Sequence, residues 1–384
     1  MALKLSEKKL MLEIIKNDKN VNDKRMKLLL ENTVEIIWKS FGNELRSVDN
    51  NCLLFIDPIV LSNNQYILDL ENESCNLKLI PTNINEHTKS SESLISILTV
   101  FENEGVGRRN TNIYAVGGGV LLDVVSMACS IYRRGVDVIK VPTTLLAMVD
   151  ASIGVKTGIN FLGQRNRIGT YNINYDVILD SSLLNNNPSL TLQGMGEVIK
   201  IAIIKSKKLF ELIENNIQDI LKINFFETLV GEKIIDLSIN LMLEELHNNP
   251  REINLKRCVD FGHTFSPLVE MQAIENNKYR NIPHGFAVGY DCLLTAKLSL
   301  NRGILSITDF ARINNLFKKL DMDFENHVYD DNLLLWYSLL EMTKHRGGNQ
   351  NLPIPTEIGQ HHFISDVTYD ELCIANNELR AQFN

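Results

Sequence analysis

The sequence has few features of a secreted protein. Its 384 residues include only six cysteines, and no two of them form a C-x-x-C pair. Scattered cysteines favour reduced thiols and argue against a cysteine-rich zinc site. The N-terminal stretch MALKLSEKKLMLEIIKNDKN mixes acids with bases and lacks the apolar core of a signal peptide, and its acids argue against a transit peptide. We therefore expect a cytoplasmic protein.

An excess of positive charge is also lacking, because the formal net charge is −8. This balance does not favour a nucleic-acid partner, although a local cluster of Arg and Lys leaves an anionic small substrate open. The stretch at 113–132 has the length of a membrane span but contains three consecutive glycines and Asp123. These features fit a buried strand, a tight turn and a buried helix better, so we expect no membrane partner.

The composition that is present, 44% apolar and 22% charged residues, is typical of a globular protein, and the length suits two domains. Residues 1–48 are rich in Lys and Glu and predict a helical N-terminal arm. Short apolar runs then alternate with helical patterns, which predicts a Rossmann-like α/β domain over 49–185. Beyond the Asn-rich tract at 185–189 helical spacing dominates, which predicts a mostly α-helical domain over 186–384.

A run of three glycines, Gly117, Gly118 and Gly119, directly follows an apolar run and precedes a helical pattern. Glycine lets the backbone approach a pyrophosphate closely, and the N-terminus of the next helix offers free N–H groups. The spacing is not the usual G-x-G-x-x-G, so a close-packed turn is the alternative. The run is a candidate phosphate-binding turn.

The segment VPTTLLAMVDASIGVKTGINFLGQRNRIGTY at 141–171 carries an unusual set of polar residues between glycines. Core packing does not require such a set, whereas binding a polyhydroxylated, phosphorylated ligand does. A solvated basic loop is the alternative. The set comprises Asp150, Lys156, Arg165, Asn166 and Arg167, and YRRG at 132–135 adds two guanidinium groups nearby in sequence.

Three residues have the chemistry of a metal site. GMGEVIK at 194–200 places Glu197 and Lys200 on one helix face, His263 lies in DFGHTFSP, and His284 lies in IPHGFAVGYD. Taken singly, a surface ion pair and structural histidines would explain them. One Glu and two His on separate segments match the His₂Glu zinc set, which leaves positions open for substrate or water. In glycine-marked contexts they predict a zinc site.

Taken in order, these motifs resemble the sugar phosphate cyclases, the family of 3-dehydroquinate synthase. The motifs that carry the resemblance are GGGVLLD, YRRG, PTTLLAMVD, GVKTGIN, RNRIG, GMGEVIK, FGHT and HGF. The resemblance implies a nucleotide-binding α/β domain followed by a helical metal-binding domain. It also implies NAD and zinc as cofactors, with cobalt as a possible substitute, a sugar phosphate as substrate, and a homodimer.

One branch of this family resembles the chain more than the others do. Dehydroquinate synthases usually carry a second His where this chain has Pro267, whereas MLEELHNNPREINLKRCVDFGHTFSP and HRGGNQNLPIPTEIG resemble the 2-epi-5-epi-valiolone synthases. Those enzymes cyclise sedoheptulose 7-phosphate. The implied reaction consists of transient oxidation by NAD⁺, phosphate elimination, reduction and intramolecular aldol closure. Two residues depart from the family pattern: Phe286 replaces the acid of HGE, and Arg165 replaces a Lys.

The resemblance also implies roles for individual residues. Glu197, His263 and His284 match the zinc ligands. The matches to NAD-binding positions are Glu86, Lys89, Gly117, Gly118, Gly119, Asp123, Thr143 and Thr144, with Asp57 as a further candidate. The matches to substrate-contacting positions are Asp150, Lys156, Asn166 and Lys200. Candidate phosphate contacts are Arg134, Arg165, Lys256 and Arg346, and the sequence does not rank Lys256 against its neighbour Arg257.

Three other interpretations remain open at this stage. The chain could be 3-dehydroquinate synthase itself, or a sedoheptulose 7-phosphate cyclase of the 2-epi-valiolone or desmethyl-4-deoxygadusol type. It could be a metal-dependent alcohol dehydrogenase of related architecture, which would leave net NADH in solution. It could also be a catalytically inactive binding protein, because Phe286 replaces a family acid.

Overall fold

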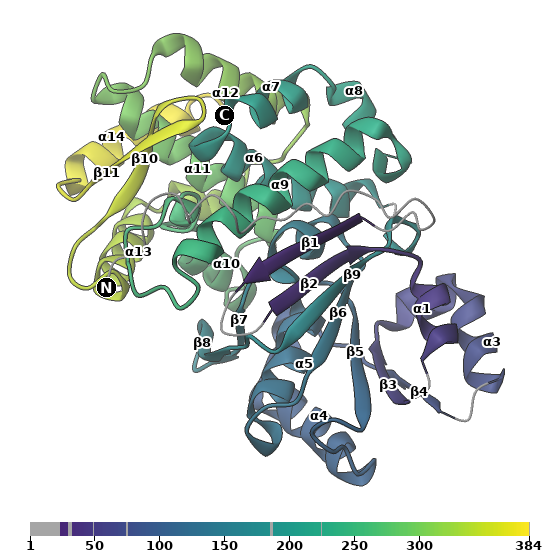
Figure 1. The fold of residues 1–384 in the computed structure, drawn as a ribbon. Helices are drawn as coiled ribbons and strands as arrows, with labels where there is room; N and C mark the ends of the chain where they lie inside the picture. The colour runs from purple at the N-terminus through teal and green to yellow at the C-terminus, as the bar shows by residue number, and fades with distance from the viewer. Residues whose placement is uncertain are drawn as a thin grey trace, which may run out of the picture. The chain divides into compact units, whose positions relative to one another are not determined.

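The computed structural model of the chain describes residues 24–29, 33–48, 50–73, 76–184, 187–223 and 225–383 (Figure 1). The described residues group into two compact units. The first contains those within Met1–Leu162, Asn166–Asn185 and Leu246–Arg251, and the second contains those within Gly163–Arg165, Asn186–Glu245 and Glu252–Asn384. The predicted boundary at residue 185 stays a prediction, because residues 185 and 186 lie outside the described part of the chain.

The first unit is built on a seven-stranded sheet with the strand order β1-β2-β9-β6-β5-β3-β4. The pairings from β2 to β4 are all parallel, and only β1 and β2 are antiparallel. This sheet confirms the predicted Rossmann-like class. The strands are β1 (Lys24–Leu29), β2 (Thr33–Trp38), β3 (Asn51–Ile56), β4 (Leu77–Pro81), β5 (Thr111–Gly117), β6 (Val138–Pro142) and β9 (Tyr175–Leu179).

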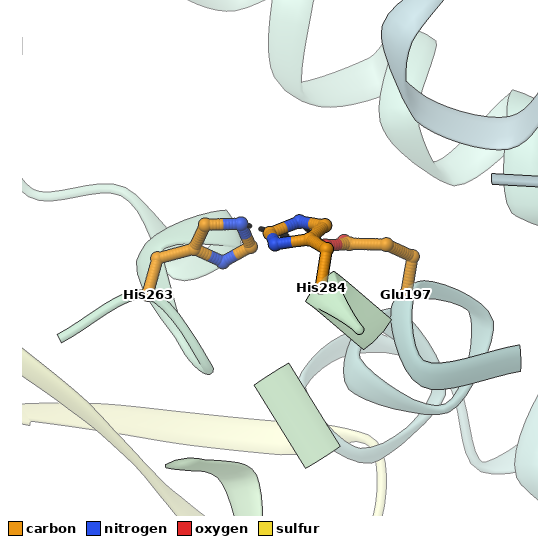
Figure 2. A group of neighbouring side chains, drawn as sticks. All are labelled: Glu197, His263 and His284. Carbon is orange, nitrogen blue, oxygen red and sulfur yellow. Dashed lines mark hydrogen bonds and ion pairs between the residues drawn. The ribbon is translucent and has the colours of Figure 1, made fainter. Parts of the chain in front are cut away.

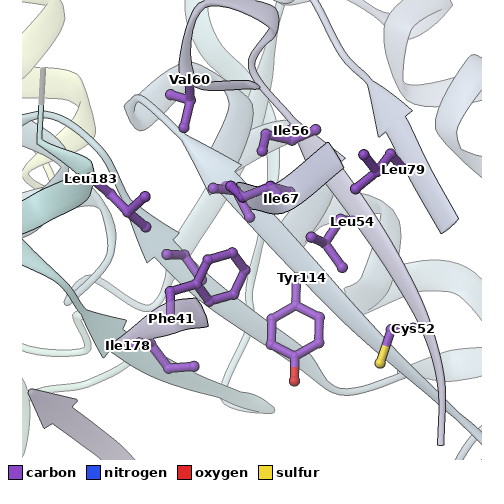
Figure 3. Packing of buried hydrophobic residues seen from close by; sticks show 12 residues of the cluster. Phe41, Cys52, Leu54, Ile56, Val60, Ile67, Leu79, Tyr114, Ile178 and Leu183 are labelled. Atoms are coloured by element: carbon purple, nitrogen blue, oxygen red, sulfur yellow. The ribbon is translucent and has the colours of Figure 1, made fainter. Parts of the chain in front are cut away.

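Helices cover both faces of this sheet, as the alternation of side chains along its strands shows. Leu54 on β3 packs in one buried cluster with Phe41 and Ile67 (Figure 3). Its neighbour Phe55 points to the opposite face, where its ring meets that of Phe101 edge-on at 5.5 Å. The first face is covered by α1 (Phe41–Ser47), α2 (Pro58–Asn63) and α3 (Gln65–Glu73), and the second by α4 (Ser91–Asn103) and α5 (Gly119–Ile131).

The stretch at 113–132 forms the predicted strand, turn and helix, namely β5, the glycine run and α5. The N-terminal arm differs from the prediction. Residues 1–23 lie outside the described residues, but β1 and β2 are strands where the Lys/Glu-rich composition predicted helix, and only α1 is helical. The β-branched residues of TVEIIW at 33–38 favour a strand, and parallel pairing with β9 holds that segment extended.

A buried lysine fixes the loop that follows β6. Lys140 is 1% exposed, and its Nζ donates to the carbonyl oxygens of Ala151, Ser152 and Gly154 at 3.4, 3.3 and 2.8 Å. The same nitrogen lies 3.9 Å from the centre of the Tyr175 ring. Burial lowers the pKa of Lys140 to about 8, although Asp123 and Asp150 act to raise it.

Replacing Lys140 by Met should therefore lower the free energy of unfolding by roughly 2 kcal/mol at neutral pH, because three buried or partly buried carbonyls lose their donor. The folded protein releases this proton at lower pH than the unfolded chain does. The wild type should thus gain stability relative to Lys140→Met as the pH rises from about 8 to 10.5. Urea unfolding of both proteins across this range tests the prediction.

The matched control is Lys78→Met, which removes a lysine from β4 that pairs with Glu104 at the surface. This replacement should change the free energy of unfolding by no more than about 0.5 kcal/mol, and the change should be the same over this pH range. A Lys140→Met variant as stable as the wild type would show that the amine does not hold this loop.

The second half of the chain is mostly helical, as predicted. It also contains a hairpin that was not predicted, β10 (Leu352–Glu357) with β11 (Gln360–Ile364), and a second unpredicted hairpin, β7 (Lys156–Phe161) with β8 (Gln164–Tyr171), lies within the predicted α/β domain. No helix of the described residues is long and apolar enough to cross a bilayer. The helices are α6 (Pro188–Lys205), α7 (Lys207–Glu214), α8 (Ile217–Ile220), α9 (Leu229–Asn248), α10 (Ser266–Glu275), α11 (His284–Asn301), α12 (Ile307–Lys319), α13 (Asn332–His345) and α14 (Tyr369–Arg380).

Candidate active site

The second unit brings the three predicted metal ligands together. Glu197 lies in the middle of α6, His263 lies in the turn before α10, and His284 is the first residue of α11. Figure 2 shows the three side chains converging on one point. Oε1 of Glu197 lies 3.1 Å from Nε2 of His284 and 3.4 Å from Nε2 of His263. One ligand atom from each residue lies within 4.8 Å of the other two.

These distances fit a zinc ion. Ligand atoms that are 2.0–2.1 Å from a tetrahedral zinc lie about 3.3 Å from one another. The two distances from Glu197 bracket this value, and a carboxylate with two imidazoles is a donor set that zinc prefers. The three side chains could therefore serve as zinc ligands, and such a three-residue set would leave a position open for substrate or water.

A glycine next to each ligand lets the backbones approach. A Cβ on Gly196 would lie 2.1 Å from the carbonyl oxygen of Gly285, so α6 and α11 are in contact beside Glu197 and His284. Gly262 has φ +77°, and a Cβ there would lie 2.8 Å from Sγ of Cys292 on α11. The glycines that marked the sequence motifs thus determine the spacing of the three ligands.

A buried cation pairs with the central carboxylate. Nζ of Lys200 lies 2.5 Å from Oε2 of Glu197, and both side chains are at most 3% exposed. Burial would raise the pKa of Glu197, but Lys200, His263 and His284 together hold it well below its usual value. Glu197 is therefore ionised and able to act as a ligand at neutral pH.

A second carboxylate lies behind His284 and was not predicted from the sequence. Oε1 of Glu270, on α10, lies 2.8 Å from Nδ1 of His284, and its Oε2 pairs with Nη1 of Arg165. Burial lowers the pKa of His284, but Glu270 and Glu197 outweigh this effect and raise it to about 9. A metal ion must therefore displace a proton from this imidazole when it binds at neutral pH.

Another unpredicted acid fixes the segment that follows His263. Oδ2 of Asp291 accepts the backbone N–H groups of Thr264, Phe265 and Ser266 at 2.8, 2.6 and 3.0 Å. These groups lie at the N-terminus of α10, which has no cap of its own. Burial raises the pKa of Asp291 to about 6 even though the three N–H groups act to lower it. The segment after the ligand is thus held by α11.

The predicted cofactor residues of the first unit lie at the carboxyl ends of its parallel strands. Gly117 ends β5, Thr143 follows β6, Asp57 follows β3, and Glu86 and Lys89 lie in the loop after β4. From β3 the chain continues to β4 on one side, whereas β5 and β6 lie on the other side of β3. Open α/β sheets bind ligands at such a reversal of strand order, outside the carboxyl ends.

The backbone of the glycine run is accessible at its second position. Gly118 caps α5, and a Cβ there would meet only Cγ2 of Thr144, at 3.8 Å. A Cβ on Gly119 would instead lie 3.2 Å from that of Ala151. The Asp57 carboxylate accepts the backbone N–H of Ile59 and caps α2, which is a structural role for this candidate.

Four of the predicted residues are joined in one polar network. Nζ of Lys89, which is 2% exposed, lies 2.6 Å from both Oδ2 of Asp123 and Oδ1 of Asn166. The amide of Asn160 donates to Oε1 of Glu86 at 2.8 Å and accepts the backbone N–H of Asn166 at 2.9 Å. Asn160 was not predicted, and it connects Glu86 to Asn166.

The remaining candidates of the first unit are more dispersed. Asp150 lies in a π-helical turn at Ala147–Ala151, and Lys156 is an exposed residue at the start of β7. Arg134 is exposed and has φ +67°. It follows α5 and precedes β6, so it lies at the amino ends of the parallel strands, whereas the glycine run lies at their carboxyl ends. The described unit does not bring Arg134 together with the other candidates, so its phosphate role stays a prediction.

The structure distinguishes the basic candidates near His263. The Arg257 guanidinium pairs with Glu252 and Asp260, whereas Lys256 is exposed. Lys256 is therefore the better candidate for a phosphate. Arg346 is only 3% exposed and donates to the backbone oxygen of Gln350 and to Oγ1 of Thr264 at 2.9 and 3.0 Å. These bonds give Arg346 a structural role, and its predicted phosphate contact remains a prediction.

The two units define a class of protein. Its first unit has an α/β fold of the type that binds nucleotides, and its helical second unit carries three side chains suited to bind a metal ion. The chain belongs to the 3-dehydroquinate synthase family. The family profile for the 3-dehydroquinate synthase N-terminal region matches residues 79–193, and that for the C-terminal region matches residues 194–345. The family resemblance read from the motifs is thereby confirmed.

Particular relatives are similar over most of their length. The chain is 35% identical to a 2-epi-5-epi-valiolone synthase of an Actinomyces species, over 81% of this chain and 82% of the relative. It is 31% identical to the demethyl-4-deoxygadusol synthase of Trichormus variabilis, over 88% and 82%. Among solved structures, the 2-epi-5-epi-valiolone synthase ValA of Streptomyces hygroscopicus, with NAD⁺ and Zn²⁺ bound, matches with a TM-score of 0.85 and 31% identity, over 92% of this chain and 98% of ValA.

Proposed function

We propose that this protein is a sedoheptulose 7-phosphate cyclase that forms 2-epi-5-epi-valiolone with release of phosphate, and hence a carbon–oxygen lyase. The observation that carries the proposal is the convergence of Glu197, His263 and His284 at zinc-ligand distances, in a chain similar to 2-epi-5-epi-valiolone synthases. Pro267, in place of a family His, supports a substrate without the carboxylate of the dehydroquinate precursor.

Glu197, His263 and His284 would hold zinc, or cobalt as a substitute. Zinc, when bound, supplies a Lewis acid that acidifies a sugar hydroxyl. The cofactor NAD⁺ would be held by the glycine run, Thr143 and Thr144, and by Glu86, Lys89 and Asp123. When bound, NAD⁺ supplies a hydride acceptor that is regenerated within each turnover, so phosphate release consumes no cofactor.

The protein's own residues would orient the sugar and move protons. We propose that Lys200 contacts substrate hydroxyls, because a buried ammonium beside Glu197 can donate hydrogen bonds to oxygens held there. Asp150, Lys156 and Asn166 are the proposed contacts to the sugar in the first unit. Lys256 is the proposed phosphate contact near His263, since its ammonium is exposed.

Purified, zinc-loaded protein should release inorganic phosphate from sedoheptulose 7-phosphate in the presence of catalytic NAD⁺. NADH should not accumulate, because the hydride returns within the turnover. Accumulation of NADH would indicate an alcohol dehydrogenase instead. No release from this sugar, but release from 3-deoxy-arabino-heptulosonate 7-phosphate, would indicate a 3-dehydroquinate synthase.

A second product class is supported by the similarity to the demethyl-4-deoxygadusol synthase of Trichormus variabilis. Phosphate release alone does not separate the two cyclases, so the product must be identified by NMR. A deoxygadusol product has one hydroxyl group fewer than the valiolone product. A 2-epi-valiolone product would differ from the valiolone product only in stereochemistry.

We also propose that the enzyme is a cytoplasmic homodimer. The free thiols of Cys52, Cys129, Cys258, Cys292 and Cys373 support a reducing compartment, and the dimer rests on the family resemblance. Light scattering of the purified protein measures its mass against the 43.6 kDa of one chain. Fractionation of the source cells locates it.

A further inference from the structure

Glu270 and Arg165 form a pair behind His284, on the side of the imidazole away from Glu197. Oε1 of Glu270 lies 2.8 Å from Nδ1 of His284, while Nε2 of the same ring lies 3.1 Å from Oε1 of Glu197. The imidazole is thus held at both nitrogens by carboxylates from two different helices, α10 and α6.

The chemistry of the contacts determines which nitrogen carries a proton when the other binds a metal ion. Nη1 of Arg165 also lies 3.0 Å from Nδ1 of His284, but an arginine can only donate. A carboxylate can only accept, so Nδ1–H donating to Glu270 satisfies both atoms. The lone pair of Nε2 then faces Glu197 and the metal position. The opposite tautomer would place a lone pair against the carboxylate of Glu270.

Arg165 balances the charge of Glu270. Glu270 is 3% exposed, and a carboxylate buried to this extent is costly without a cation. Its second oxygen, Oε2, pairs with Nη1 of Arg165, so its two oxygens are divided between the imidazole and the guanidinium. The carboxylate at His284 comes from α10, so it does not depend on residue 286, where Phe replaces the family acid.

We propose that Glu270 is a positioning residue for the metal centre. It fixes the tautomer and ring orientation of His284, and Arg165 is its counter-ion. Hydrogen bonds from a ligating imidazole to a carboxylate orient the ring and make it a stronger ligand. This role differs from the phosphate contact that the family resemblance implies for Arg165. The proposal rests on the metal site of the proposed function and not on the identity of the sugar.

The test is zinc affinity, measured by competition with a chromophoric chelator on the full chain. Glu270→Gln keeps the size of the side chain but removes its charge, and it should weaken zinc binding by about 10–100-fold. The absorption bands of Co²⁺ in the variant should also shift, because the geometry of one ligand changes. The matched control is Glu214→Gln, which removes a carboxylate that pairs with Arg312 away from the centre, and its affinity should equal that of the wild type.

Zinc affinity and a Co²⁺ spectrum unchanged in Glu270→Gln would overturn the proposal while leaving the metal site intact. A wild type that binds no zinc would instead overturn the proposed function. If Glu270→Gln fails to fold, the wild type itself provides the test. NMR of zinc-loaded protein with ¹⁵N-labelled histidine, assigned with His284→Asn, should show His284 protonated at Nδ1, and the opposite tautomer would refute the role of Glu270.

The role of Arg165 as counter-ion is tested by a double-mutant cycle with Glu270. Arg165→Met should lower the melting temperature of the metal-free protein, because Glu270 loses its cation. Adding Glu270→Gln should recover part of this loss, since the buried charge is then gone. If the two changes were simply additive, Arg165 would not act as the counter-ion of Glu270.

Discussion

Replacing His263 by Ala should lower the rate of phosphate release to about a thousandth of the wild-type rate. Zinc contributes several kcal/mol to such reactions, and about 4 kcal/mol corresponds to roughly a thousandfold. His263 is the most exposed of the three proposed ligands, with 28% of its side chain accessible, so its removal should disturb folding least. Two proposed ligands, Glu197 and His284, remain, so we expect weakened zinc binding. The measurement is steady-state phosphate release together with zinc content after dialysis.

Excess zinc should restore part of the activity of His263→Ala, because the loss comes from metal occupancy and not from misfolding. The matched control is His327→Ala, at a histidine whose side chain is 85% exposed and pairs with Asp330 nearby. It should keep full activity and zinc content. A His263→Ala protein that loses its zinc but still turns over the sugar phosphate at the wild-type rate would show that metal at this site is not needed.

The parts of the metal centre that the sequence predicted are those with a local signal. Glu197, His263 and His284 each lie beside a glycine, and the structure shows that these glycines bring the backbones close enough for the ligands to meet. Glu270 and Asp291 have no such signal, because their partners are determined by helix packing. Both are single acids within apolar helical stretches, VEM and GYDCL. A buried acid requires a partner, so this pattern could have marked them.

The same division holds for the fold. The strands β3, β5, β6 and β9 are short apolar runs, which are the pattern from which the α/β domain was predicted. The β1 strand and the β7–β8 hairpin are polar segments, which are extended because of their pairing with other strands. Composition does not show strand pairing, and β2 joins the sheet through β9, which is distant in sequence, so composition alone predicted a helical arm where β1 and β2 lie.

Replacing Lys200 by Met should destabilise the metal-free protein by about 3–5 kcal/mol, because it leaves the Glu197 carboxylate buried without its nearest cation. The ammonium lies 2.5 Å from this carboxylate. Zinc, as a second cation, should remove much of this cost. The difference in melting temperature between wild type and variant should therefore be larger without zinc than with it, as measured by thermal unfolding in the presence and absence of a chelator. Phosphate release should also fall by about 100-fold or more, since Lys200 is the proposed contact to the substrate hydroxyls.

The pH dependence of this difference has a defined sign. In the wild type the pKa of Glu197 is held well below its usual value, with Lys200 as the main cause opposing burial. The ionised Glu197 carboxylate contributes stability at pH values above its pKa in the unfolded chain. This contribution is lost as the pH falls through its pKa in the folded protein. In Lys200→Met the pKa of Glu197 rises, so the variant takes up the proton earlier. The gap between the two metal-free proteins should therefore narrow in acid.

Lys205→Met is the control on the same helix, because Lys205 pairs with Glu244 and Glu245 nearer the surface. Its cost should be about 1 kcal/mol or less and should not depend on zinc. The comparison shows whether zinc binds at Glu197, beside Lys200, or elsewhere. If the cost of Lys200→Met is the same with and without zinc, the ion does not neutralise Glu197 and must bind elsewhere. If zinc reduces that cost but not the cost of Lys205→Met, the ion and Lys200 share the charge of Glu197, as the proposed zinc site implies.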